Sequence, residues 1–328
     1  MTAPSNTKNV AYFSIDILFE KALDFDLEEI ANAVSEDYPL TPVEVHPVNI
    51  GKSIKTDQVV FGMLKPLDAR NGHVIVMNGT GSPDEDFRAA DHSEIAWRSG
   101  GYAHCALDAI RSHQSYITLS VQTFDHSLEG KFRAVRQLMA VSAVFAQLPI
   151  AIGILVHWSS HMIAASTWVT GAQKSMRGEW PLYEWFSFRC GWEAKKSMSD
   201  RCAVGYTKGL RNFLGFELHV AAAPVNPSDA KTLLRKACLF SLQSNRELRD
   251  GQMVTLENDP HRYKVRRPRN ANNTPGAVIV LLHPGTLENE KPDADPAWSK
   301  TGSDTIYRSQ RPNPNFMQTL FAKQAPAS

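Results

Sequence analysis

One long stretch without charged side chains limits what this chain can fold into. From residue 137 to residue 173 there is no Asp, Glu, Lys or Arg. A run this apolar could cross a membrane, but Pro149 interrupts it, and the β-branched residues that follow suit a strand. We therefore expect a buried helix over residues 128–147, a turn at Pro149 and a buried central strand over residues 150–157, and no membrane span.

Alternating and helical patterns elsewhere predict a mixture of strands and helices. The other expected strands are residues 10–19, 43–48, 59–64, 73–78, 116–123, 182–190, 216–222, 253–256, 263–267 and 277–282. The other expected helices are residues 27–35, 103–112, 162–173 and 227–241. This order predicts an α+β fold with a mixed or antiparallel sheet and helices packed on one of its faces.

A strand, a loop and an amphipathic helix follow one another three times, beginning at Phe13, Tyr116 and Phe216. This layout predicts two ferredoxin-like or βαβ halves that share a sheet, and either duplication or common packing rules could produce it. We expect one large domain over residues 1–283, divisible into pseudo-halves 1–100 and 101–283. The segment 284–328 is rich in Pro and Asn and is expected to form a C-terminal arm.

Charge and cysteine usage narrow the classes of function and compartment. The 35 Lys and Arg residues nearly balance the 34 Asp and Glu residues, which argues against a nucleic-acid binder. The four cysteines are scattered without paired spacing, and the polar N-terminus has no secretory signal. These features predict a cytoplasmic protein without a disulfide framework.

His157 and His161 are spaced four residues apart, as on one face of a helix that could hold zinc. Trp158 stands where a metalloprotease has its Glu, so that class is excluded. We favour hydrogen-bonded histidines at the end of a buried strand. The alternative is a metal-assisted hydrolase that uses His157, His161 and a nearby acid, and no other cofactor is expected.

Two sets of residues are candidates for binding a partner. The first is an acidic loop that follows the strand ending near residue 78 and contains Asp84, Glu85, Asp86 and Asp91. The second is the pair Trp180 and Trp192, at the two ends of an aromatic segment, because tryptophan is common at interface hot spots.

A short motif near residue 210 resembles a known family. Its residues are Thr207, Gly209, Leu210, Phe213, Gly215 and Glu217. The segment 206–220 thereby resembles the bacterial domain of unknown function 4261 family, apart from Leu214 between Phe213 and Gly215. The resemblance implies an α+β fold. Through the association of such proteins with contact-dependent or type VI secretion toxins, it also implies an immunity or accessory role.

The residues of this motif also have a physical interpretation of their own. Thr207 to Leu210 predicts a turn into a short helix, and Glu217 could pair with Lys208 or Arg211. We favour a corner that fixes the local fold over a ligand site.

Together these features predict a cytoplasmic, non-enzymatic protein-binding module. Its expected role is that of an immunity or accessory protein that binds and occludes a bacterial toxin or effector. A homodimer formed through an exposed strand is compatible with this role, whereas nucleic acid and membrane partners are not expected. The metal-assisted hydrolase remains the alternative.

Overall fold

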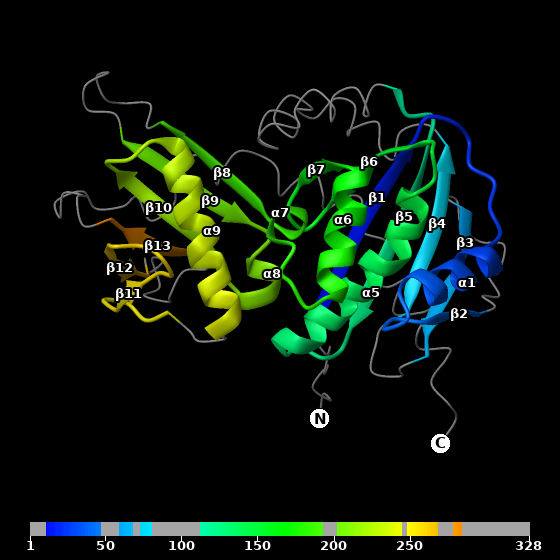
Figure 1. Cartoon of the computed structure of the whole chain (residues 1–328), viewed down its shortest axis with the longest axis horizontal. Helices are drawn as coiled ribbons and strands as arrows, with labels where there is room; N and C mark the ends of the chain where they lie inside the picture. The colour runs from blue at the N-terminus through cyan, green and yellow to red at the C-terminus, as the bar shows by residue number, and fades with distance from the viewer. Residues whose placement is uncertain are drawn as a thin grey trace, which may run out of the picture.

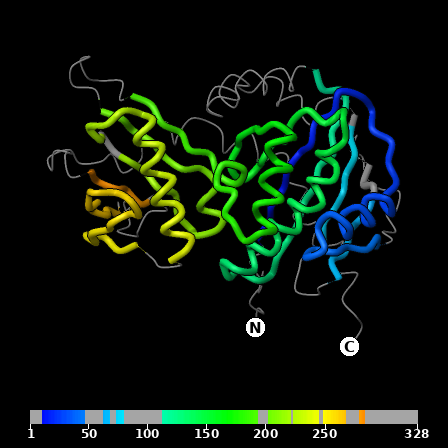
Figure 2. Tube along the Cα trace, viewed as in Figure 1, coloured from blue at the N-terminus to red at the C-terminus, as the bar shows by residue number. Residues whose placement is uncertain are grey.

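Two β-sheets with attached helices make up the described part of the chain (Figure 1). The computed structural model describes residues 11–46, 59–67, 73–80, 112–192, 202–244, 248–267 and 278–283. The trace in Figure 2 shows a first lobe formed by the earlier part of the chain and a second lobe formed by the later part. The α+β class is therefore confirmed, but the expectation that both halves share one sheet is wrong.

The first lobe is built on a seven-stranded sheet in the order β2-β3-β4-β5-β1-β6-β7. Its strands are β1 (Ala11–Phe19), β2 (Val43–His46), β3 (Val59–Pro66), β4 (Val74–Thr80), β5 (Ser115–Thr123), β6 (Ala151–Val156) and β7 (His161–Ala164). All neighbouring strands run antiparallel. Strand β1 therefore lies inside the sheet, between β5 and β6.

Three helices cover one face of this sheet: α1 (Leu27–Asp37), α5 (Leu128–Ala146) and α6 (Ala165–Met176). Strand β1 alternates, so that Phe13, Ile15 and Ile17 join the core under these helices. The hydroxyl of Ser127 caps α5 by accepting a hydrogen bond from the Gly130 N–H at 3.0 Å. This packing buries most of the uncharged stretch within the first lobe, as expected, but its strand β6 is next to the end of the sheet and is not the central strand that we predicted.

None of the helices in the described ranges is long and apolar enough to cross a membrane.

The second lobe is a six-stranded sheet in the order β11-β12-β13-β10-β9-β8. Its strands are β8 (Ser187–Trp192), β9 (Ala203–Lys208), β10 (Glu217–Ala223), β11 (Met253–Thr255), β12 (Arg262–Arg266) and β13 (Val278–Leu282). Only the β10–β13 pair is parallel among the pairs described. Helix α9 (Pro227–Ser244) packs on β8, β9 and β10 and buries an apolar stripe that includes Leu234 and Cys238.

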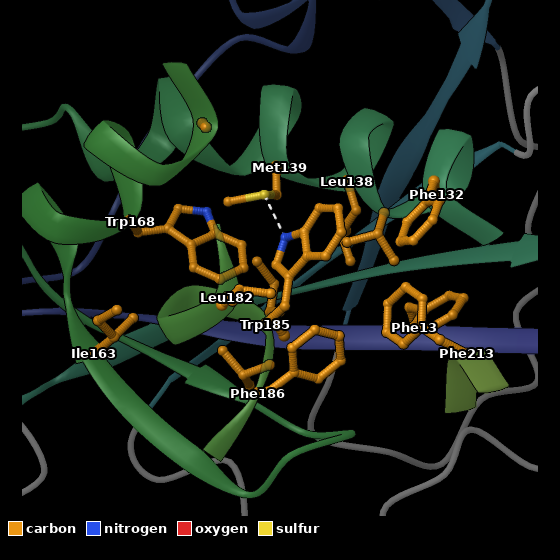
Figure 3. Packing of buried hydrophobic residues seen from close by; sticks show 14 of the residues in the cluster. Phe13, Phe132, Leu138, Met139, Ile163, Trp168, Leu182, Trp185, Phe186 and Phe213 are labelled. Carbon is orange, nitrogen blue, oxygen red and sulfur yellow. Dashed lines mark hydrogen bonds between the residues drawn. The ribbon is translucent and has the colours of Figure 1, made fainter. Parts of the chain in front are cut away.

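An aromatic cluster joins the two lobes (Figure 3). Two short helices lie there, α7 (Leu182–Trp185) and α8 (Arg211–Leu214). Phe213 of α8 lies 5.1 Å from Phe13 of β1 and 5.7 Å from Trp185 of α7, measured between ring centroids. The indole N–H of Trp185 also donates to the sulfur of Met139 in α5, at 2.7 Å. The hydrophobic core is therefore continuous between the lobes.

Two expected elements differ from the structure. The expected helix over residues 162–173 begins only at Ala165, because His161–Ala164 forms strand β7. The expected strand over residues 182–190 is a helical turn followed by β8. The expected helix 103–112 lies almost entirely outside the described residues, and the arm 284–328 lies wholly outside them, so the domain division stays a prediction.

Candidate functional site

The two histidines of the predicted zinc pair flank a turn that links β6 to β7, so their helical spacing has no meaning here. His161 stands opposite Val156, whose side chain belongs to the core on the helix-covered face of the sheet. The side chain of His161 therefore lies on that face too. The hydroxyl of Ser159 lies 2.7 Å from Nδ1 of His161, and Nε2 lies 3.0 Å from the carbonyl oxygen of Tyr183. Because a carbonyl can only accept, Nε2 carries the proton and donates it to Tyr183. Burial lowers the pKa of His161 to about 4.

His157 lies on the opposite face of the same sheet. Its backbone N–H donates to the carbonyl of Ser14 at 3.1 Å, and its Nε2 lies 2.9 Å from Oδ2 of Asp16. Since His157 and His161 are on opposite faces, they cannot bind one metal ion, and the predicted pairing is wrong. Within the described ranges, no group of three or more His, Cys, Asp or Glu side chains could hold a metal. The acid that contacts His157 is Asp16.

A stripe of polar side chains runs across β1, β5 and the end of β6. This polar stripe consists of Tyr12, Ser14, Asp16, Thr118, Ser120 and His157. Thr118 stands opposite Asp16 in the register and donates its hydroxyl to Oδ1 of Asp16 at 2.7 Å. The hydroxyl groups of Ser14 and Ser120 share a hydrogen bond of 3.0 Å. Tyr12 donates to Ser120 at 2.7 Å.

Asp16 is the centre of this stripe, and only 2% of its surface is exposed. A buried carboxylate is costly unless it is hydrogen-bonded or paired. Thr118 donates a hydrogen bond to one oxygen, and Nε2 of His157 lies 2.9 Å from the other oxygen without the angle of a hydrogen bond. Alternation along β1 could have indicated from the sequence that Ser14 and Asp16 share a face, but our sequence prediction did not select them. His157 was selected only for its spacing to His161, and its contact with Asp16 gives no local signal because the two residues are distant in sequence.

The residues of the family-like motif meet at the carboxylate of Glu217. Its four donors are the hydroxyl of Thr207 (2.7 Å) and the backbone N–H groups of Gly209 (2.8 Å), Leu210 (3.2 Å) and Arg211 (3.1 Å). The predicted turn into a short helix is present, as α8. Arg211 contacts Glu217 through its backbone and not through its guanidinium group.

The Glu217 corner holds together β9, α8 and β10. The hydroxyl of Thr207 also accepts from the Leu218 N–H at 2.8 Å, which ties β9 to β10. Burial raises the pKa of Glu217 to about 7, and its hydrogen bonds oppose this shift. Both carboxylate oxygens are engaged by the protein itself, which is the geometry of a structural corner.

Two other motif residues shape α8. Phe213 is buried in the aromatic cluster that joins the lobes. Gly215 ends α8 with φ = 84°, a left-handed conformation that favours glycine. Leu210 is also fully buried. The motif therefore positions one lobe against the other.

The predicted partner-binding residues are not assembled into one described surface. Asp84, Glu85, Asp86 and Asp91 all lie outside the described residues. Trp180 is half-buried, with its ring 4.1 Å from that of Phe132, so it belongs to the aromatic cluster. Trp192 is 44% exposed at the end of β8.

A group of aromatic and basic side chains lies next to β8, the strand that ends at Trp192. Tyr183 is also 44% exposed, and two cations from α9 lie over its ring, Lys231 at 5.6 Å and Arg235 at 5.8 Å. Arg235 also donates a hydrogen bond of 3.3 Å to the Tyr183 hydroxyl. We call Tyr183, Trp192, Lys231 and Arg235 the β8–α9 surface. The sequence shows that Lys231 and Arg235 are four residues apart on a helix, but it does not show their contact with Tyr183.

Comparison with known proteins finds no family model, no curated protein and no solved structure that matches the chain. The resemblance to the domain of unknown function 4261 family therefore stays a prediction.

Proposed function

We propose that this protein binds another protein through the β8–α9 surface. The observation that carries this proposal is the half-exposed ring of Tyr183 with the cations of Lys231 and Arg235 over it, together with the exposed Trp192 at the end of β8. Tyrosine, tryptophan and arginine are the residues most often found at interface hot spots. The contacts of Lys231 and Arg235 with Tyr183 order these three side chains before binding, which lowers the entropy lost on binding.

The charge of this surface indicates the chemistry of the partner. Lys231 and Arg235 both belong to α9 and both contact the ring of Tyr183. Lys231 is half-buried and Arg235 is exposed, so both charges lie at the surface of the second lobe. A partner with carboxylates opposite them would gain electrostatic complementarity and faster association. We therefore assign an acidic protein surface as the partner.

The position of β8 adds a second means of binding. Among the described strands, β8 lies at one end of the second sheet and pairs only with β9. An edge strand offers backbone N–H and C=O groups to another chain. A strand of the partner, or of a second copy of this chain, could pair there while its acidic side chains contact α9.

The resemblance to the domain of unknown function 4261 family suggests which partner to test. It implies a bacterial toxin or effector that this protein occludes, as an immunity or accessory protein would. The product of a neighbouring gene is the first candidate, because toxins and their immunity proteins are commonly encoded together.

Binding can be tested by isothermal titration calorimetry of the full chain with that candidate. We expect Trp192→Ala to weaken binding by about 2 kcal/mol, or roughly thirtyfold in Kd. Met253→Ala is the matched control, because Met253 is also 44% exposed but lies on β11 at the opposite end of the sheet. We expect it to change binding by less than about 0.5 kcal/mol.

A charge reversal tests the acidic partner. Arg235→Glu should weaken binding and reduce its salt dependence, whereas Arg266→Glu on β12 is the control with an exposed arginine elsewhere in the same lobe. Equal losses in the two variants would contradict the assigned surface. No binding of the candidate at micromolar concentration would remove the proposed toxin partner.

A further inference from the structure

Arg189 of β8 is a buried cation that forms no ion pair within the described ranges. Only 8% of its surface is exposed, and none of the ion pairs described involves its guanidinium group. Its hydrogen bonds go to neutral oxygens: Nε donates to the Ser187 hydroxyl at 3.3 Å, Nη1 to the Tyr206 hydroxyl at 3.1 Å and Nη2 to the Ser160 carbonyl at 3.1 Å. Arginine is almost never buried unless an anion balances its charge.

The two glutamates of this region are engaged by other groups. The side chain of Glu184 packs against α6, because a Cβ at Gly171 would lie 2.5 Å from its Cγ. Both oxygens of Glu217 accept hydrogen bonds within its own corner. The charge of Arg189 acts on His161 instead: burial is the main cause of the low pKa of that imidazole, and the guanidinium group lowers it further. The described groups around Arg189 therefore do not neutralise it.

The surroundings of Arg189 also hold more hydrogen-bond donors than acceptors. A guanidinium group carries five N–H groups, and the described hydrogen bonds leave one N–H on Nη1 and one on Nη2. The hydroxyl protons of Ser187 and Ser160 have no acceptor among the described residues, although each residue is only 4% exposed. Buried donors without acceptors are costly. The excess of donors and the positive charge both favour an oxyanion as the ligand.

We propose that Arg189, Ser187 and Ser160 bind a phosphate ion between the two lobes. Phosphate has four oxygens that accept hydrogen bonds, so it suits two N–H groups and two hydroxyl groups better than the two oxygens of a carboxylate do. Ser160 belongs to the β6–β7 turn of the first lobe, whereas Arg189 and Ser187 belong to β8 of the second lobe. A bound phosphate would therefore link the lobes.

This site is separate from the β8–α9 surface. A Cβ at Gly205 would lie 2.6 Å from the Cys190 sulfur and 3.0 Å from Leu234 of α9, so Cys190 and Gly205 face that helix. Side chains alternate along a strand, so Arg189 lies on the opposite face of β8. Failure of the phosphate site would thus leave the proposed partner binding untouched.

Equilibrium dialysis of the full chain against radiolabelled inorganic phosphate, at constant ionic strength, tests the site. We expect one phosphate per chain with a Kd of roughly 1 mM or tighter. Arg189→Lys keeps a positive charge but loses the two parallel N–H groups, so it should weaken binding by about tenfold or more. Ser187→Ala removes a single donor and should weaken binding roughly fivefold.

The matched control is Arg133→Lys, because Arg133 is a half-buried arginine that already pairs with Asp125 at 2.6 Å. We expect it to bind phosphate as the wild type does. Circular dichroism shows whether each variant is folded, and Ser187→Ala keeps the test decisive if Arg189→Lys unfolds. No binding to the wild type at about 10 mM phosphate, unchanged affinity in folded Arg189→Lys or Ser187→Ala, or displacement of phosphate by equimolar acetate would overturn the site.

Discussion

Glu217 is a carboxylate whose surroundings are set almost entirely by its own neighbours. Four donors from residues 207–211 converge on it, so the backbone groups at the start of α8 are satisfied without water. This residue could be singled out from the sequence because the whole motif spans little more than ten residues. Its role as a structural corner also follows from local chemistry, since its acceptors are used within the protein.

The pKa of Glu217 predicts how this corner responds to pH. Burial raises that pKa from 4.5 to about 7, so between these values the folded protein binds the proton more tightly than the unfolded chain. The stability contributed by Glu217 therefore falls as pH rises from 4.5 to 7. His161 acts in the opposite direction, because burial lowers its pKa from 6.5 to about 4 and its contribution is lost as pH falls.

Comparison with Glu217→Gln isolates the carboxylate, because both proteins keep the histidines. We expect the free energy of unfolding of the wild type, relative to the variant, to fall by roughly 1–3 kcal/mol between about pH 5 and about pH 8. Urea denaturation at each pH measures this difference. A difference that does not change with pH would contradict the raised pKa.

The polar stripe shows the limit of residue-level prediction from one sequence. Ser14 and Asp16 lie on a strand that was predicted correctly, and His157 was selected for its spacing to His161. The contact between Asp16 and His157 depends on β6 pairing with β1, which joins residues far apart in the chain. No local pattern specifies that register, so the acid next to His157 could be expected but not identified.

At the scale of elements, the wrong start of the helix predicted over residues 162–173 came from a turn that lacks the usual turn residues. The turn over residues 157–160 has no Gly, Asn or Pro, and Ser160 adopts φ = 47° there. Arg189 of the second lobe donates to the Ser160 carbonyl at 3.1 Å, so a distant strand holds the turn. Periodicity alone therefore predicted a helix where β7 begins. Long elements with strong patterns, such as β1 and α5, were predicted within a residue or two.

Two glycines that flank α8 should differ in their tolerance of alanine. Gly209 and Gly215 both have positive φ, 104° and 84°, so either substitution strains the backbone. A Cβ at Gly209 would also lie 2.8 Å from Cβ of Ser159, whereas one at Gly215 meets nothing within 4 Å. We expect Gly215→Ala to cost about 1 kcal/mol and Gly209→Ala roughly 3 kcal/mol.

The midpoint of urea unfolding measures both costs, provided that the slope with denaturant is unchanged. Equal losses in the two variants would show that the close approach of Gly209 to the β6–β7 turn does not affect stability.

At the scale of the whole molecule, the two sheets meet through aromatic packing and not through shared strands. Phe213 from the second lobe contacts rings of β1, α5 and α7 in the aromatic cluster shown in Figure 3. The sequence predicted one large domain but could not show where one sheet ends and the next begins. That division depends on which strands pair, and strand pairing is decided by contacts between distant segments.

Because the aromatic cluster packs the two lobes against each other, we expect both lobes to unfold together. We expect circular dichroism and tryptophan fluorescence to report one transition at the same urea concentration in the wild type. Phe213→Ala removes ring contacts at 5.1 Å to Phe13 and 5.7 Å to Trp185, so it should cost about 3–5 kcal/mol and separate the two signals. Phe124→Ala is the control, since Phe124 is 59% exposed. Coincident transitions after Phe213→Ala, with a loss no larger than that of the control, would mean that the lobes are coupled elsewhere.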